Sequence, residues 1–400
     1  MLKRAGFHSA SVPFPPCFGA LTSPRTALLA TAFAALAFVA LALLAHAAPE
    51  PIKLGMFASL TGKQAYFGET NSRGAAFAVE ELNAAGGLLG RPVELLVEDT
   101  RSMPGEAATS AKKLLHRDHV VALVSGTASS PALEVAPLCQ AAGVPLVAAT
   151  ATNPRVTETG DFIFRACFAD PFQGTVLARF AKDRLHARRV AVLVANGSAY
   201  SVGLAKYFRE RFTADGGEVV AEPKYAEGEK DFRAQLTAVK AAKPDAVFAS
   251  GDYLESALIC VQARALGLTM PFFGGDTWDA TALVELGGKA VEGGYFTAHF
   301  SPEARDPAVQ SFVSRFAQRF GLKPDTGMSL GYDAVMLLAD AIRRAGSTDG
   351  RAVRDALAAT KDFAGVTGRI TIDAQRNAAK SAAIFTIRDG KFVYLESVEP

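Results

Sequence analysis

Cysteine is scarce in this chain of 400 residues, and its four cysteines show no CxxC spacing. Cys17 lies in a leader described below, so Cys139, Cys167 and Cys260 remain in the exported protein. A chain with so few cysteines depends on its apolar core rather than on a disulfide framework. Whether two of the three pair is left open by the sequence.

Excess charge of either sign is also absent. The formal charge is +2 for the whole chain and −1 once Lys3, Arg4 and Arg25 are removed with the leader. Such a balance predicts neither nucleic-acid binding nor a basic membrane-binding face.

Signatures of enzymes and cofactor sites are missing as well. No nucleophile elbow, P-loop or GxGxxG opens a helix. His116 and His119 stand three apart in KKLLHRDH without a nearby third ligand, which favours a solvated face over zinc. Asp252 and Asp276 are conceivable as an acid–base pair, but nothing in the sequence marks either as protonated. We therefore expect no catalysis, no metal and no cofactor.

What is present at the N-terminus is one long apolar run, from Thr26 to Ala47, with basic residues before it and a small-x-small ending. This pattern predicts a secretory signal peptide, residues 1–47, cleaved before Ala48. The run is long enough to span a bilayer, so an uncleaved anchor is the alternative. No second such run follows, and we expect a soluble protein in the periplasm.

The remaining 353 residues are enough for two domains. Short apolar runs alternate with helix-period segments from Ile52, which predicts an α/β fold with doubly wound parallel sheets covered on both faces. The alternation of predicted strands and helices starts again after DFIFRACFADPFQG, so two similar lobes are expected rather than one large sheet.

The C-terminal part changes character. Three helices follow one another without strands and should return to cover the first sheet, and the last two strands read as a hairpin through an Asp-Gly turn. The predicted division is residues 48–168 and 299–366 for lobe 1, and residues 169–298 and 367–400 for lobe 2.

Ligands of open parallel sheets bind beyond the carboxyl ends of the strands. In lobe 1 these ends, residues 61–67, 125–130 and 150–153, carry hydroxyls and small side chains. In lobe 2 the ends, residues 196–200, 251–253 and 275–278, carry two carboxylates and several aromatic rings. Taken alone, VAATATNPRVT is typical of a turn.

Two of these ends have complementary chemistry. SGTASSPALE predicts a helix start with Ser130 as N-cap, and a helix start attracts anions. A carboxylate held by Ser129 and Thr152, with Asp276 opposite to hold an ammonium, matches a free α-amino acid.

A series of motifs follows Ile52 in a fixed order: LTGKQAYFGET, ATNP, FRACFADPFQG, QARALG, GGDTW, LGYDAVMLLADAIRRAGS and FAGVTGRITID. Through these motifs, essentially all of the chain after Ile52 resembles the leucine/isoleucine/valine-type periplasmic binding proteins of ABC importers. The resemblance implies two lobes that close on a ligand about three crossings, and delivery of a small amino acid of branched-chain type to the transmembrane subunits of an ABC permease. We also expect a monomer.

The resemblance also implies roles for single residues. Carboxylate contacts fall on Ser129 and Thr152, and the Thr150 carbonyl and Asp276 stand where the family holds the amino group. Phe67 and Tyr200 match aromatic positions that face the ligand.

Two residues leave the identity of the ligand open. Asp252 stands where tyrosine is often found, and a second carboxylate points to an amide, a urea-like compound or a basic amino acid, unless Asp252 only caps the helix expected from Glu255. Trp278 walls the pocket or packs at a lobe edge.

A small aromatic acid would fit the same architecture. A ligand-sensing receptor module is a further alternative, but a receptor needs a transmembrane segment after the module, and this sequence stops at Pro400.

Overall fold

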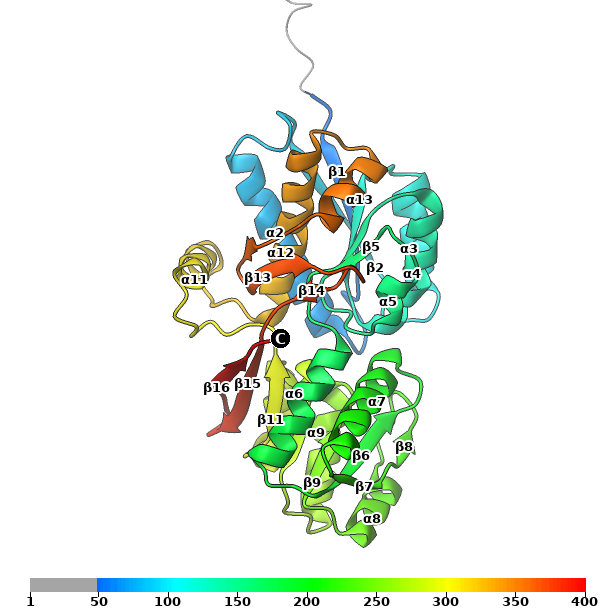
Figure 1. Ribbon diagram of the computed structural model, residues 1–400, viewed down its shortest axis with the longest axis vertical. Helices are drawn as coiled ribbons and strands as arrows, with labels where there is room; N and C mark the ends of the chain where they lie inside the picture. The colour runs from blue at the N-terminus through cyan, green and yellow to red at the C-terminus, as the bar shows by residue number, and fades with distance from the viewer. Residues whose placement is uncertain (1–48) are drawn as a thin grey trace, which may run out of the picture. The chain divides into compact units, whose positions relative to one another are not determined.

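A computed structural model of the protein describes residues 49–400, so the predicted signal peptide, residues 1–47 with Cys17, lies outside the described residues. Two large sheets and one small sheet organise this part of the chain (Figure 1). Within it, no helix combines the length and the apolar character that crossing a bilayer requires. Its three cysteines are buried and free.

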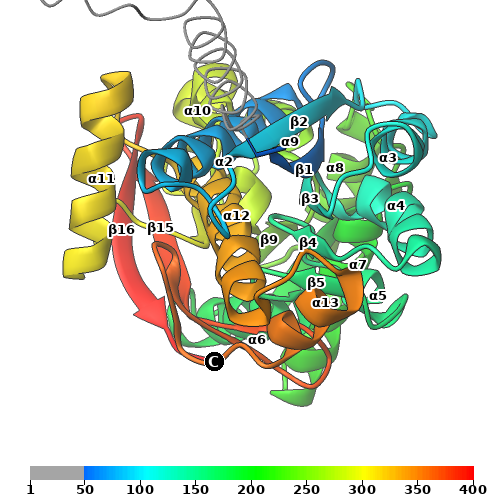
Figure 2. The ribbon, with the colours of Figure 1, turned by 90° about the horizontal axis from the view of Figure 1, so that it is seen from above.

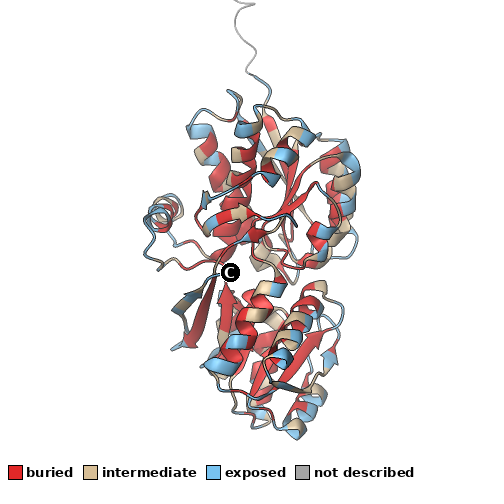
Figure 3. Cartoon of the chain, in the orientation of Figure 1, coloured by how far each residue is buried: buried red, intermediate tan, exposed pale blue. Residues whose placement is uncertain are grey.

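The first sheet has the strand order β2-β1-β3-β4-β5, and every neighbouring pair is parallel. Its central strands are apolar and buried on both faces, as expected for a sheet covered by helices (Figure 3). Its elements in chain order are β1 (Ile52–Ala58), α2 (Ala65–Ala84), β2 (Val93–Asp99), α3 (Glu106–His116), β3 (Ala122–Gly126), α4 (Ser129–Ala142), β4 (Leu146–Ala148), α5 (Arg155–Glu158) and β5 (Ile163–Arg165).

The second sheet has the order β16-β15-β11-β10-β9-β6-β7, with β8 beside β6. Its first elements are α6 (Asp170–Asp183), β6 (Arg189–Ala195), α7 (Ala199–Ala214), β7 (Glu218–Ala221), β8 (Lys224–Tyr225), α8 (Arg233–Ala242), β9 (Ala246–Ala249) and α9 (Tyr253–Ala265). They are followed by β10 (Phe272–Gly274), the 3-10 helix η1 (Asp276–Trp278), α10 (Thr281–Gly287), the 3-10 helix η2 (Gly288–Val291) and β11 (Tyr295–Ala298).

The sheet ends in an antiparallel hairpin of β15 (Ala382–Arg388) and β16 (Lys391–Val398). The predicted Asp-Gly turn is confirmed: Asp389 and Gly390 both have positive φ, as the favoured two-residue hairpin turn requires. The hairpin makes this sheet mixed rather than purely parallel.

Between β11 and β15 the chain returns to the first lobe, as predicted. It forms α11 (Pro307–Phe320), α12 (Thr326–Ala345) and α13 (Gly350–Ala358), then a small sheet of β12 (Phe363–Gly365), β13 (Gly368–Ile372) and β14 (Ala378–Ala379). The chain therefore passes between the two large sheets three times.

The small sheet corrects one predicted boundary. Ile370, Ile372 and Ala378 belong to the same apolar core as the first sheet. Residues 367–379 therefore pack with lobe 1, and the last crossing lies near Lys380 instead of between residues 366 and 367.

Helices α2 and α12 lie side by side on the first sheet (Figures 1 and 2). Their close approach depends on glycine, since a Cβ at Gly74 would meet the Met328 carbonyl and one at Gly331 would meet the Asn71 carbonyl. This packing brings the first turns of both helices to the same edge of the sheet, where the strand ends of lobe 1 lie.

Candidate ligand-binding site

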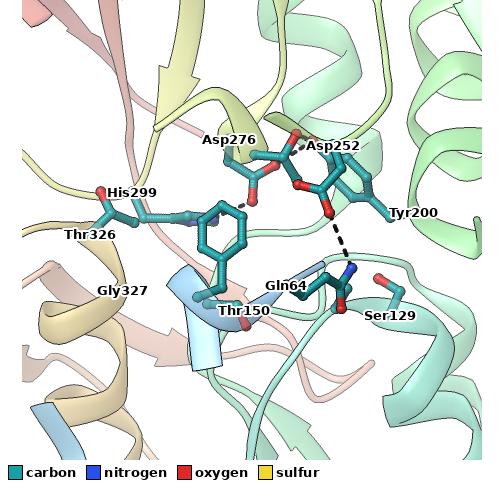
Figure 4. A pocket seen from close by; sticks show the side chains of 12 residues that line it. Gln64, Ser129, Thr150, Tyr200, Asp252, Asp276, His299, Thr326 and Gly327 are labelled. Carbon is teal, nitrogen blue, oxygen red and sulfur yellow. Dashed lines mark hydrogen bonds and ion pairs between the residues drawn. The ribbon is translucent and has the colours of Figure 1, made fainter. Parts of the chain in front are cut away.

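A small cavity lies where the strand ends of the two lobes meet (Figure 4). Lobe 1 contributes the starts of α2, α4 and α12 and the end of β4, and lobe 2 contributes the starts of α7, α9 and η1. One further residue comes from the crossing after β11. The lining residues are Gln64, Phe67, Ala128, Ser129, Thr150, Tyr200, Asp252, Asp276, Thr277, His299, Thr326 and Gly327.

The lobe 1 side of the cavity is built around the start of α4. Ser129 is the first residue of this helix, so the free N–H groups of its first turn and the positive end of its dipole lie at the cavity. Ser129 Oγ accepts a hydrogen bond of 3.2 Å from the Asn153 N–H. The Thr150 hydroxyl donates to the Thr127 carbonyl at 3.1 Å. This side can receive an anion.

The lobe 2 side is centred on Asp276, the first residue of η1. Its Oδ1 accepts hydrogen bonds from Gln173 Nε2 at 2.7 Å and from the Tyr200 hydroxyl at 2.8 Å, and its Oδ2 lies 3.1 Å from His299 Nε2. Burial alone would raise the pKa of Asp276, but the hydrogen bond and charge of His299, with Gln173 and Tyr200, hold it below its usual value. Asp276 is therefore a buried, ionised carboxylate, suited to a cation.

Asp252 provides a second carboxyl group at the cavity. It is the N-cap of α9, where its Oδ1 accepts from the Tyr253 N–H at 2.8 Å. Its Oδ2 accepts a 3.3 Å hydrogen bond from Gln64 Nε2 of lobe 1. Burial, and next the charge of Glu255, raise the pKa of Asp252 to about 7. The predicted capping role is confirmed, although the helix starts two residues earlier than expected, and Gln64 supplies the donor that a second carboxyl group needs.

Aromatic rings close the cavity on the side of α2. The Phe67 ring packs edge-on against Tyr253 of lobe 2, with 5.5 Å between ring centroids. The Tyr253 hydroxyl donates to the Lys63 carbonyl at 3.1 Å. An ion pair of 2.7 Å between Lys63 and Glu227 lies nearby. The segment before α2 therefore contacts lobe 2 through apolar, hydrogen-bonded and charged groups.

Of the nine residues predicted for the site, six line the cavity: Phe67, Ser129, Thr150, Tyr200, Asp252 and Asp276. Thr152 is buried behind it, beside the Asp170 carboxyl group. Ser130 is not the N-cap of α4, because the helix begins at Ser129 after Ala128, and its Oγ instead accepts from the Ala199 N–H of lobe 2 at 3.1 Å.

Trp278 lies in the core of lobe 2 rather than along the cavity. Its side chain is fully buried, and Nε1 donates to Ser256 Oγ at 3.0 Å. Asp276 and Trp278 share the single turn of η1 and point to different surroundings.

Sequence reasoning missed His299, Gln173, Thr326 and Gly327. His299 directly follows β11, a strand of four residues that the apolar pattern did not reveal. Thr326 and Gly327 open α12 after Asp325, whose side chain caps this helix by accepting from the Met328 N–H at 2.8 Å. That N-cap aspartate was the signal that could have placed them at a helix start.

Comparison with known proteins gives consistent matches over the described chain. The family model described as periplasmic binding protein matches residues 51–391. Leu/Ile/Val-binding protein homolog 3 of Brucella melitensis is 32% identical over 359 residues, which cover 88% of this chain and 95% of that protein. BraC3, a Leu/Ile/Val-binding protein of Rhizobium johnstonii, is 32% identical over 356 residues, with 88% and 95% covered.

Two solved structures are similar to this protein in fold. The leucine-binding protein LivK of Thermotoga maritima has a TM-score of 0.84 and 38% identity, covering 87% of this chain and 99% of its own. LivJ of Streptococcus pneumoniae, solved with isoleucine, has a TM-score of 0.82 and 33% identity, covering 88% and 100%.

Proposed function

Because the chain belongs to the periplasmic binding protein family, we propose that its cavity holds a free α-amino acid of branched-chain type. Proteins of this family are the extracytoplasmic substrate-binding partners of ABC permeases and are not enzymes. In the proposed complex the ligand carboxylate meets Ser129 and the start of α4, and the ammonium meets Asp276. Residues 1–47 would act as a cleavable export signal, and the exported protein would work as a monomer.

The observation that carries the proposal is the placement of opposite preferences across one small cavity. An anion-attracting helix start on lobe 1 faces an ionised carboxylate on lobe 2. A zwitterion satisfies both, and a buried charge is tolerated only when it is paired. The names of the relatives, which are Leu/Ile/Val-binding or leucine-binding, support the amino-acid class.

Closure follows from this division of contacts. A ligand that touches both lobes favours the state in which the lobes meet, in proportion to its greater affinity for that state. Contacts between the lobes that need no ligand, such as the bond from Gln64 to Asp252, add to the same preference.

The runner-up ligand carries a hydrogen-bond donor in its side chain, as an amide, a urea-like compound or a basic amino acid does. The observation that favours it is Asp252, a carboxyl group at the cavity in addition to Asp276. We place it second because both Asp252 oxygens already accept protein hydrogen bonds, from Tyr253 and Gln64.

A thermal-shift screen followed by calorimetry tests the proposal. A ligand at one hundred times its Kd adds about 2.7 kcal/mol to the stability of the folded state, which corresponds to several degrees in Tm. We expect L-leucine, L-isoleucine or L-valine to raise Tm. L-leucinamide, which lacks the carboxylate, should leave Tm unchanged. A shift with glutamine or urea but not with these three would favour the runner-up, and no shift with any amino acid would reject the proposed function.

A further inference from the structure

Arg165 does not touch the cavity, yet every hydrogen bond of its side chain goes to the segment that borders it. The residue ends β5, at the first crossing, and is fully buried. One terminal nitrogen donates to the Ala151 carbonyl at 2.7 Å, and the other donates to the Asn153 carbonyl at 2.7 Å and to Thr157 Oγ1 at 3.2 Å. No carboxylate is among its hydrogen-bond partners in the described part of the chain.

A buried charge with no hydrogen-bonded carboxylate is costly, by several kcal/mol per ion, unless other oxygens satisfy it. The charge of Asp170 favours the ionised guanidinium, but Asp170 makes no hydrogen bond to it. Here those oxygens come from residues 151–157 alone. The guanidinium is planar, with its donors in a rigid fork, so it also fixes the directions of the carbonyls that it bridges. Arg165 and this segment therefore hold each other in place.

The peptide unit between the two held carbonyls is the one that carries the Asn153 N–H. This N–H donates to Ser129 Oγ at 3.2 Å. A hydroxyl group has one proton to donate and two lone pairs that accept. Because the Asn153 N–H occupies a lone pair of Ser129, the hydroxyl proton of Ser129 remains available to an oxygen in the cavity.

We propose that Arg165 is a positioning residue for the carboxylate end of the ligand. Through the carbonyls of Ala151 and Asn153 it aims the Asn153 N–H at Ser129, and this orients the Ser129 hydroxyl as a donor. The part of the inference that concerns a carboxylate rests on the proposed function. The part that concerns the segment around Asn153 does not.

A double-mutant cycle with L-leucine as the probe tests the ligand part. Arg165→Lys keeps the charge, but a single ammonium cannot reproduce the fork that spans both carbonyls. We expect Arg165→Lys and Ser129→Ala each to weaken binding about tenfold or more in titration calorimetry, the size of a lost hydrogen bond to a charged group. The double variant should be no weaker than the weaker single variant, because both changes remove the same contact.

Thr157→Val is the matched control. It removes one hydrogen bond of Arg165 and leaves the two carbonyl contacts in place. Thr157 does not line the cavity and does not hold the peptide unit of Asn153, so we expect a change of about threefold or less in affinity, at the low end of what one hydrogen bond contributes. Additive losses in the cycle, or a loss in Thr157→Val as large as in Arg165→Lys, would overturn the proposal.

Hydrogen exchange in the ligand-free full-length protein tests the segment without any ligand. Arg165→Lys should speed exchange over residues 147–157 and leave β6 of lobe 2 unchanged. Unchanged exchange over residues 147–157 would overturn the positioning role. If L-leucine fails to bind the unmodified protein but exchange accelerates as expected, the proposed ligand is wrong and the positioning of the segment by Arg165 stands.

Discussion

His299 Nε2 lies 3.1 Å from Asp276 Oδ2, so the carboxylate proposed to hold the ligand ammonium already has a basic neighbour. The imidazole belongs to the second crossing and stacks on Phe168 of the first crossing, with 3.6 Å between ring centroids. Burial lowers the pKa of His299 from its usual 6.5, Asp276 opposes this effect, and the charge of Lys380 adds to it. A protonated His299 would pair with Asp276 and compete with the ammonium.

We therefore expect the affinity for L-leucine to fall on acidification. Bound ammonium would lower the pKa of His299 further, so ligand binding and protonation oppose each other. Above the His299 pKa of the free protein the imidazole is neutral and does not compete. Below it, and hence below pH 6.5, the affinity should decrease by up to about tenfold per pH unit. Calorimetry between pH 8 and pH 5 measures this slope.

His299→Gln is the control, because glutamine can donate to Asp276 but does not titrate. We expect its affinity to vary little between pH 7 and pH 5. An equally steep profile in the variant would assign the pH dependence to other groups, such as Asp252, whose pKa is about 7.

Asp276→Ala should weaken amino-acid binding at least a hundredfold. The substitution leaves the ligand ammonium buried without its charge partner, which costs about 3–5 kcal/mol. Titration calorimetry gives the affinity, and circular dichroism checks that the variant is folded. A near-native affinity would move the ammonium site away from Asp276.

Tyr200→Phe provides a graded comparison for the same carboxylate. It removes one of the three groups that contact Asp276 and leaves Gln173 and His299 in place. Asp276 should remain ionised at pH 7, so we expect a loss of about tenfold or less, the size of one hydrogen bond.

Gln64→Met should weaken the binding of every ligand by a similar factor. The Gln64 side chain donates a hydrogen bond to Asp252 of the other lobe. Loss of this bond should destabilise the state in which the two lobes meet by about 0.5–1.5 kcal/mol. This corresponds to a loss of about two- to tenfold in calorimetry. If the loss is confined to ligands with a donor in the side chain, Gln64 and Asp252 contact the ligand directly.

The matched control for Gln64→Met is Lys63→Met in the neighbouring position. Its ion pair with Glu227 also crosses between the lobes, but the two side chains are 36% and 30% exposed. Partly exposed ion pairs contribute about 0–1 kcal/mol, so we expect a smaller effect, which shrinks further in high salt.

The two lobes of alternating strands and helices could be predicted, because strands buried on both faces have sequences that are short apolar runs between helix-period segments. The hairpin was predictable from Asp389 and Gly390 for a local reason, the positive φ of its turn. Two strands of the small third sheet, β13 and β14, were assigned to the wrong lobe. Its strands have five residues or fewer, and the side on which Ile370 and Ile372 pack depends on a partner far away in the chain.

For the site, the rule that ligands lie beyond strand ends was enough to collect residues from both lobes. What it could not supply was the direction of each side chain. Ser129 and Ser130 are adjacent, yet one lines the cavity and the other bonds to Ala199 of lobe 2. Arg165 and Gln173 act through other residues, and nothing in a linear pattern of residue types reveals such indirect contacts.

Trp278 gives a spectroscopic test of this difference in direction, because it is the only tryptophan of the chain. Its ring is fully buried in the lobe 2 core and makes its hydrogen bond to Ser256, away from the cavity lining. We expect blue-shifted emission in the native protein, a red shift on unfolding in guanidinium chloride, and no shift of the emission maximum with saturating L-leucine. Phe67→Trp in a Trp278→Phe background places the fluorophore on the cavity wall, so its emission should respond to the same ligand. An equal response from Trp278 in the unmodified protein would mean that its surroundings change on binding, and that the lobe 2 core does not move as a rigid body.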